Sequence, residues 1–118
     1  MRHHLAVILL FISTSCATPN SPARTAFALE AGYDAAISVA IAYAMLPRCA
    51  TGVAQPCSEP GIVRNANTVA HQAWQAIRGA QSAVMATRAD PAAIAQAITA
   101  ARDSLNALRA ITDKLKVS

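Results

Sequence analysis

The sequence predicts an all-α protein, an up-down-up three-helix bundle with one disulfide-closed loop. Alanine, the strongest helix former and a residue that buries little area, fills 29 of the 118 positions. Large apolar side chains recur at spacings of three and four, which is the helical period. Three stretches also open with a residue suited to capping a helix beside a proline: Ser21-Pro22, Ser58-Glu59-Pro60 and Asp90-Pro91.

The N-terminus has the layout of a secretory signal. Residues 1–4 carry positive charge, residues 5–12 are apolar, and residues 13–17 are mostly small. Eight apolar residues span about 12 Å as a helix, well short of the ~30 Å hydrocarbon core of a bilayer. We therefore expect residues 1–16 to be a signal segment that is removed, residues 17–21 a tether, and residues 22–118 a single bundle domain.

The end of this segment, Ser13-Thr14-Ser15-Cys16, resembles the signal-peptidase-II junction of bacterial lipoproteins. In that family a cysteine after a small residue becomes the lipidated first residue of the mature chain. Ser13 departs from the pattern, which has leucine there. Ordinary cleavage after Ala17 is the rival, because Ser15 and Ala17 are both small.

The resemblance to this junction covers only the first 19 residues. Through its alanine richness the chain also resembles the small bacterial lipoproteins of unknown function. The resemblance implies a membrane partner through a lipid anchor on Cys16. Because Ala17 is not aspartate, it also implies an outer-membrane lipoprotein facing the periplasm. The alternative is a soluble periplasmic or secreted protein.

Cys49 and Cys57 remain as an even pair in the mature chain, which predicts a disulfide in an exported protein. The seven residues between them include glycine and proline and are expected to form a loop. Their spacing is too wide for a Cys-x-x-Cys redox or metal site.

Residues 22–46 are expected to form the first helix. From Ala35 to Leu46 it is nearly apolar all round, so we expect it to be the central, buried element. Acidic residues and a Pro-Arg stop argue against its spanning a bilayer: Glu30, Asp34 and Pro47-Arg48.

The second and third helices are expected over residues 59–88 and 91–116. Each carries an apolar stripe, which in the third helix includes Ile98, Leu105 and Leu108. The few residues between these helices predict that they lie antiparallel.

The search for chemistry finds no catalytic constellation, so we expect no enzyme, cofactor or metal site. His71 lies on a polar helix face without a carboxylate or nucleophile at helical spacing, and is expected to be solvated. Glu30 and Asp34 share a face, but as acids near a helix start they are expected to be exposed.

The net charge of +4 becomes +3 once Arg2 leaves, and the basic residues are scattered singly. Nucleic-acid binding, which needs a concentrated basic patch, is therefore not expected.

The leading functional expectation is a non-catalytic helical interaction module. Two neighbouring helices cannot cover an apolar helix on every side. The sequence therefore predicts an exposed strip centred on Val39 and Tyr43, with Trp74 flanking the seam, that mediates self-association or partner binding. The alternative is a periplasmic small-ligand binder with an apolar pocket around Tyr33, Ile37 and Trp74.

Overall fold

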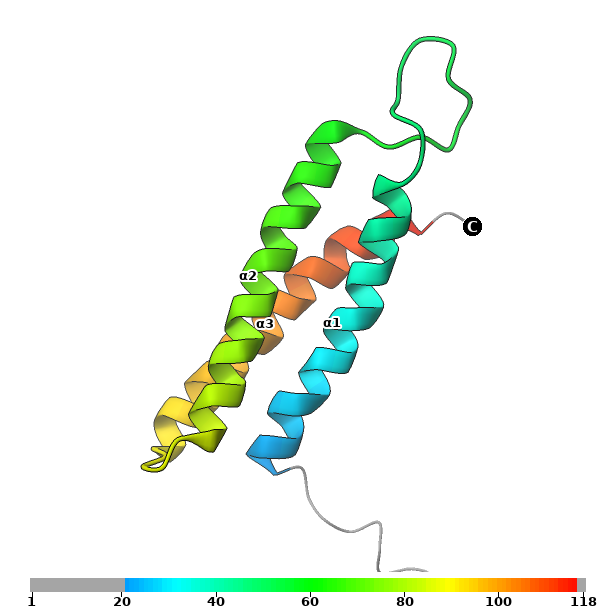
Figure 1. Ribbon diagram of the computed structural model, residues 1–118. Helices are drawn as coiled ribbons and strands as arrows, with labels where there is room; N and C mark the ends of the chain where they lie inside the picture. Colours follow the sequence, from blue (N-terminus) through cyan, green and yellow to red (C-terminus); the bar gives the residue numbers. More distant parts are fainter. Residues whose placement is uncertain (1–20, 117–118) are drawn as a thin grey trace, which may run out of the picture.

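The computed structural model describes residues 21–116 as three helices. They are α1 (Pro22–Ala44), α2 (Pro60–Met85) and α3 (Pro91–Leu115), and they run up, down and up (Figure 1). The described part of the chain contains no strand, only an isolated bridge between Arg48 and Ser58. The predicted fold class is confirmed. The signal segment, Cys16 and the first four residues of the tether lie outside the described residues.

Two of the three helix starts are capped as expected. The Ser21 hydroxyl accepts from the Arg24 amide at 3.2 Å, and the Asp90 carboxylate accepts from the Ala92 amide at 3.1 Å. The start of α2 differs, because its N-cap is Glu59 and no side chain caps it. The expected cap from Ser58 is wrong, since the buried Ser58 hydroxyl instead donates to the Leu46 carbonyl at 3.0 Å.

The core is built largely from alanine, as the composition predicts. One cluster joins Ala26 of α1 to Ile77 and Ala80 of α2 and to Ile98 and Ala101 of α3. A second cluster has the same make-up and consists of Ala36, Ala70, Ala73, Leu105 and Leu108. Small side chains let the helix axes approach closely, so a modest apolar volume fills the interior.

Gly32 lies where side chains of α3 crowd α1. A Cβ atom at this position would lie 2.5 Å from Arg109 Nη2 and 3.0 Å from Leu105 Cδ2. At Gly79 on α2, by contrast, an added Cβ atom would have no neighbour within 4 Å.

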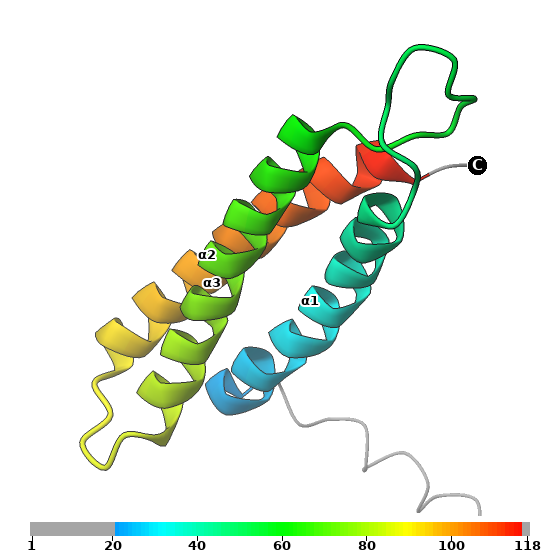
Figure 2. The ribbon, with the colours of Figure 1, turned by 45° about the horizontal axis from the view of Figure 1, so that its top comes forward.

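The expectation that the first helix is the central, buried element is wrong. Buried residues number three of 23 in α1, against six of 26 in α2 and six of 25 in α3. α2 and α3 form the tightest pair, and α1 lies along one side of them (Figure 2). A helix in a three-helix bundle has only two neighbours, so an apolar circumference cannot be covered on every side.

α1 is also long and apolar enough to cross a membrane by length and composition, a test that core helices of soluble proteins and signal sequences also pass. In the bundle it supplies Ala26, Ala36 and Ala40 to the core. Its Glu30 carboxylate accepts a hydrogen bond from α2, described below.

Candidate functional site

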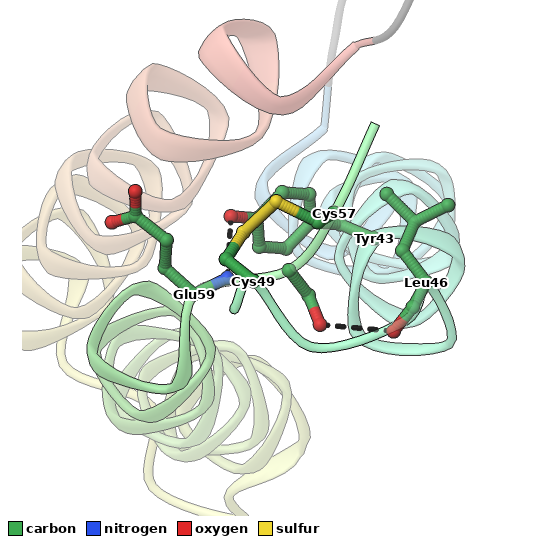
Figure 3. Close-up of a disulfide and its surroundings, with 6 residues drawn as sticks. Tyr43, Leu46, Cys49, Cys57 and Glu59 are labelled. Atoms are coloured by element: carbon green, nitrogen blue, oxygen red, sulfur yellow. Dashed lines mark hydrogen bonds between the residues drawn. A yellow bond between two sulfur atoms is a disulfide. The ribbon is translucent and has the colours of Figure 1, made fainter. Parts of the chain in front are cut away.

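The loop between α1 and α2 is closed by the predicted disulfide between Cys49 and Cys57 (Figure 3). Two backbone hydrogen bonds lie beside it, from the Cys49 amide to the Ser58 carbonyl at 2.9 Å and from the Ser58 amide to the Pro47 carbonyl at 2.8 Å. Gly52 turns the loop with a φ of 85°, in the left-handed region that glycine adopts readily. In this bonded form the pair offers no thiolate that could act as a nucleophile or a metal ligand.

Tyr43 ties the end of α1 to the start of α2. Its hydroxyl accepts a hydrogen bond from the Glu59 amide at 2.9 Å (Figure 3). This bond serves an amide at a helix start that lacks a side-chain cap. Tyr43 is half-buried, and its hydroxyl has an internal partner.

The exposed apolar surface of α1 is centred on residues other than the predicted pair. Val39 and Tyr43 are both half-buried. The large apolar side chains that α1 and its C-cap expose are Phe27 at 46%, Ile41 at 54% and Met45 at 80%. A role for Val39 and Tyr43 in binding stays a prediction, while the surface available to a partner runs through Phe27, Ile41 and Met45.

Six exposed residues form one line along α1, here called the α1 strip: Phe27, Ala31, Asp34, Ser38, Ile41 and Met45. Their spacings are four, three, four, three and four. Residues at these spacings share one helix face.

A shallow groove of about 220 Å³ lies beside the strip, between α1 and α2. Its lining is mostly apolar and includes Ile37 and Ile41 from α1 and Val63 from α2, with Arg64 and Asn67 as its polar members. The exposed apolar area of α1 is therefore continuous with a groove and is not limited to isolated side chains.

A polar cluster joins the N-terminal half of α1 to the C-terminal end of α2. Gln81, only 4% exposed, donates from Nε2 to Glu30 Oε2 at 2.7 Å. Its Oε1 accepts from Arg78 Nη1 at 3.1 Å. Glu30 is half-buried and bonded to α2, so the expectation that it is exposed is wrong. Asp34 is exposed as predicted.

Aromatic rings extend this cluster. The rings of Tyr33 and Trp74 lie 5.3 Å apart, and the Arg78 guanidinium lies 5.5 Å from the Trp74 ring centroid. Burial, and secondarily the negative charge of Asp34, raises the pKa of Tyr33 above its ordinary value. Because Tyr33 and Trp74 pack on each other, the two rings form part of the α1–α2 contact, as ordinary seam residues do.

Sequence reasoning missed Gln81, although a signal was present. It lies four residues after Ile77 and three before Val84, in register with the apolar stripe of α2. A polar residue on a buried stripe requires a hydrogen-bond partner.

His71 is exposed as predicted, with its Nε2 3.1 Å from the Gln75 side-chain nitrogen. Among residues 21–116, no group of three histidine, cysteine or acidic side chains could hold a metal ion. Comparisons of the chain with protein-family models, curated protein sequences and solved structures give no match.

Proposed function

We propose that the protein is a non-catalytic lipoprotein of the cell envelope, anchored through Cys16, whose helical bundle acts through protein contacts. The observation that carries the interaction role is the exposed apolar face of α1, with Phe27, Ile41 and Met45. Exposed apolar surface of this kind marks binding sites in soluble domains. The lipid anchor rests on the Ser15-Cys16-Ala17 junction of the sequence.

A non-catalytic role is supported by the chemistry of the polar groups. His71 pairs with an amide and is exposed, and the Glu30 carboxylate is engaged by Gln81. General acid–base or nucleophilic catalysis requires such groups to converge on one reacting position. These two groups serve the surface and the α1–α2 contact instead.

Mass spectrometry of the protein from the membrane fraction tests the anchor. The proposal predicts a mature chain that starts at Cys16 and carries acyl groups. It also predicts that Cys16→Ala moves the protein out of the membrane fraction and the detergent phase. A mature chain starting at Thr18 with an unmodified mass would establish ordinary cleavage after Ala17 and overturn the lipoprotein assignment.

A matched variant tests the destination of the lipoprotein. In enterobacterial sorting an aspartate after the lipidated cysteine retains the protein at the inner membrane, so Ala17→Asp should shift it from the outer- to the inner-membrane fraction. Acylation of Cys16 should stay unchanged. An unshifted Ala17→Asp protein would contradict the outer-membrane location while leaving the anchor intact.

A second candidate function, small-ligand binding, is favoured by another groove. A groove of about 530 Å³ lies between the start of α1 and the start of α3, lined by Pro22, Pro91, Ile94 and Ile98 with Arg102. Its volume suits a small apolar ligand. Ile94→Trp, which would fill the groove, should abolish binding of an apolar fluorescent probe, and Met85→Ala on α2 should not. Equal probe binding by wild type and Ile94→Trp would remove this candidate.

A further inference from the structure

The α1 strip has the spacing of a helix–helix seam. Alternating steps of four and three place Phe27, Ala31, Asp34, Ser38, Ile41 and Met45 in the pattern of core positions in a coiled coil. All six are exposed, so α2 and α3 leave this seam open. A seam of this kind fits another helix with the same spacing.

The sequence of the strip is complementary to itself when reversed. If a second α1 runs antiparallel with its midpoint opposite residue 36, Phe27 lies opposite Met45, Ala31 opposite Ile41, and Asp34 opposite Ser38. The outer pairs join groups that suit each other: an aromatic ring with a thioether, and a small with a large aliphatic side chain. At the centre Asp34 faces a polar residue, Ser38, whose hydroxyl donates to the Asp34 backbone carbonyl of its own helix at 2.7 Å. This register uses all six positions.

We propose that the α1 strip is a two-fold interface with a second copy of this chain, with the two α1 helices antiparallel. A two-fold interface requires such a self-complementary surface. The parallel arrangement would place Asp34 against Asp34 and Ile41 against Ile41, so that like charges meet and the small Ala31 faces another small residue. Shifting the antiparallel register by four residues leaves either Phe27 or Met45 without a partner.

The size of the contact determines how strong the association is in solution. Eighteen residues of helix extend about 27 Å, and a helix is about 10 Å wide. One helix pair therefore covers less than the 1,200–2,000 Å² that specific, stable interfaces typically bury, so the isolated chains should form only a weak dimer. Here the inference rests on the proposed function, because a lipid anchor confines the copies to one membrane and raises their effective concentration.

The anchor geometry is compatible with this pair. With residue 36 at the midpoint, the starts of two antiparallel α1 helices lie about 42 Å apart, at opposite ends of the pair. The six residues from Cys16 to Pro22 can extend at most about 20 Å. Both anchors reach one membrane when the two α1 axes lie along its surface and the two-fold axis is perpendicular to it.

Cysteine cross-linking tests the register. The experiment uses residues 17–118, which retain all three helices and the disulfide, so that an introduced cysteine is the only free thiol. A mixture of Ala31→Cys and Ile41→Cys chains should give several-fold more cross-linked dimer with a short thiol cross-linker than either variant alone. Met85→Cys, at an exposed position on α2, is the matched control and should cross-link to Ile41→Cys only at background.

Two results would overturn the inference. Self-cross-linking of Ala31→Cys as efficient as the mixed reaction would show a parallel arrangement. Cross-linking of the mixture no higher than the Met85→Cys control would show that the strip does not meet a second copy.

Sedimentation of the same unlipidated chain separates this inference from the lipoprotein assignment. As the protein concentration is raised to about 1 mM, a range that reaches weak associations, the weight-average mass should rise toward the dimer. Ile41→Lys should remain a monomer with an unchanged helical spectrum, and Met85→Lys should dimerise like wild type. A wild-type chain that stays monomeric yet binds anionic vesicles through Ile41 would make the membrane the occupant and overturn the proposal. An acylated Cys16 would still support the anchor.

Discussion

Replacing Gln81 with methionine should uncouple the N-terminal half of α1 from the end of α2. Methionine matches glutamine in volume and helix propensity, so Gln81→Met removes the amide with little change in packing or backbone preference. The Glu30 carboxylate then loses its donor at 2.7 Å, and the Arg78 guanidinium loses its acceptor at 3.1 Å. Gln81 is nearly closed to solvent and Glu30 is half-buried, so water replaces the bond to Glu30 only in part, whereas Arg78 is exposed and open to water.

The magnitude follows from the charge and burial of the partners. A hydrogen bond to a charged group contributes about 1.5–3 kcal/mol. Glu30 is half-buried and regains some water, which places its coupling with Gln81 near the lower end, about 1.5 kcal/mol. For a domain of this size that free energy corresponds to roughly 6–12 °C in the melting temperature.

A double-mutant cycle isolates this term. Wild type, Gln81→Met, Glu30→Ala and the double variant are unfolded in urea and followed by circular dichroism, and the coupling free energy is the departure from additivity. Gln96→Met, the same exchange at an exposed position of α3, is the control and should change the free energy of unfolding by less than about 0.5 kcal/mol. A Gln81–Glu30 coupling under about 0.5 kcal/mol would refute the reasoning, since it would mean that water serves the carboxylate equally well.

Three further perturbations follow from the structure. Burial, and then a neighbouring carboxylate, raises the pKa of Tyr33 in the folded state. The stability that neutral Tyr33 contributes is therefore complete below the unfolded-state pKa of about 10, and it is lost as pH rises through the folded-state pKa. Unfolding midpoints measured from pH 9 to above 10 should therefore fall less steeply in Tyr33→Phe than in wild type; parallel slopes would contradict this. Replacing both Cys49 and Cys57 with serine should cost about 2.5 kcal/mol by the loop-entropy relation, and thiol labelling of the unreduced, unfolded wild type should modify neither cysteine. Gly79→Ala should stabilise the protein by about 0.5–1 kcal/mol in thermal unfolding, because alanine has the higher helix propensity and space for its Cβ atom is open. Gly32→Ala should give no gain, because α3 side chains crowd that position and offset the gain in helix propensity. Equal gains would show that α1 does not approach α3 closely.

Local sequence signals predicted the helices and the disulfide because each depends on residues close together in the chain. Ser21 and Asp90 bond to amides two or three residues away, so their caps could be predicted. Ser58 could not, because its hydroxyl serves a carbonyl twelve residues earlier, at the end of α1. That contact crosses the disulfide-closed loop, so it depends on how the two segments lie in space and not on neighbouring residues.

The position of α1 in the bundle also lay beyond the sequence pattern. Its apolar circumference predicts burial, yet hydropathy does not specify how many neighbours a helix has. α1 contributes three alanines to the buried set, whereas Phe27, Ile41 and Met45 are exposed. Which apolar residues face outward depends on the rotation of α1 about its own axis, and the long-range Gln81–Glu30 and Tyr43–Glu59 bonds help to fix that rotation.

Those same bonds bear on how α1 can present a surface. α1 fully buries only three alanines, while Leu29, Tyr33 and Ile37 pack partly against the core, so specific ties add to the apolar contacts that place it. In the N-terminal half of α1 Glu30 bonds to Gln81, at the C-terminal end Tyr43 bonds to Glu59, and the disulfide closes the following loop. A helix held at these points presents its exposed face in one orientation, which lowers the entropy cost of binding. Gln81→Met, which leaves the α1 strip untouched, should therefore weaken self-association measured by sedimentation, and unchanged association in that variant would show that the strip needs no such support.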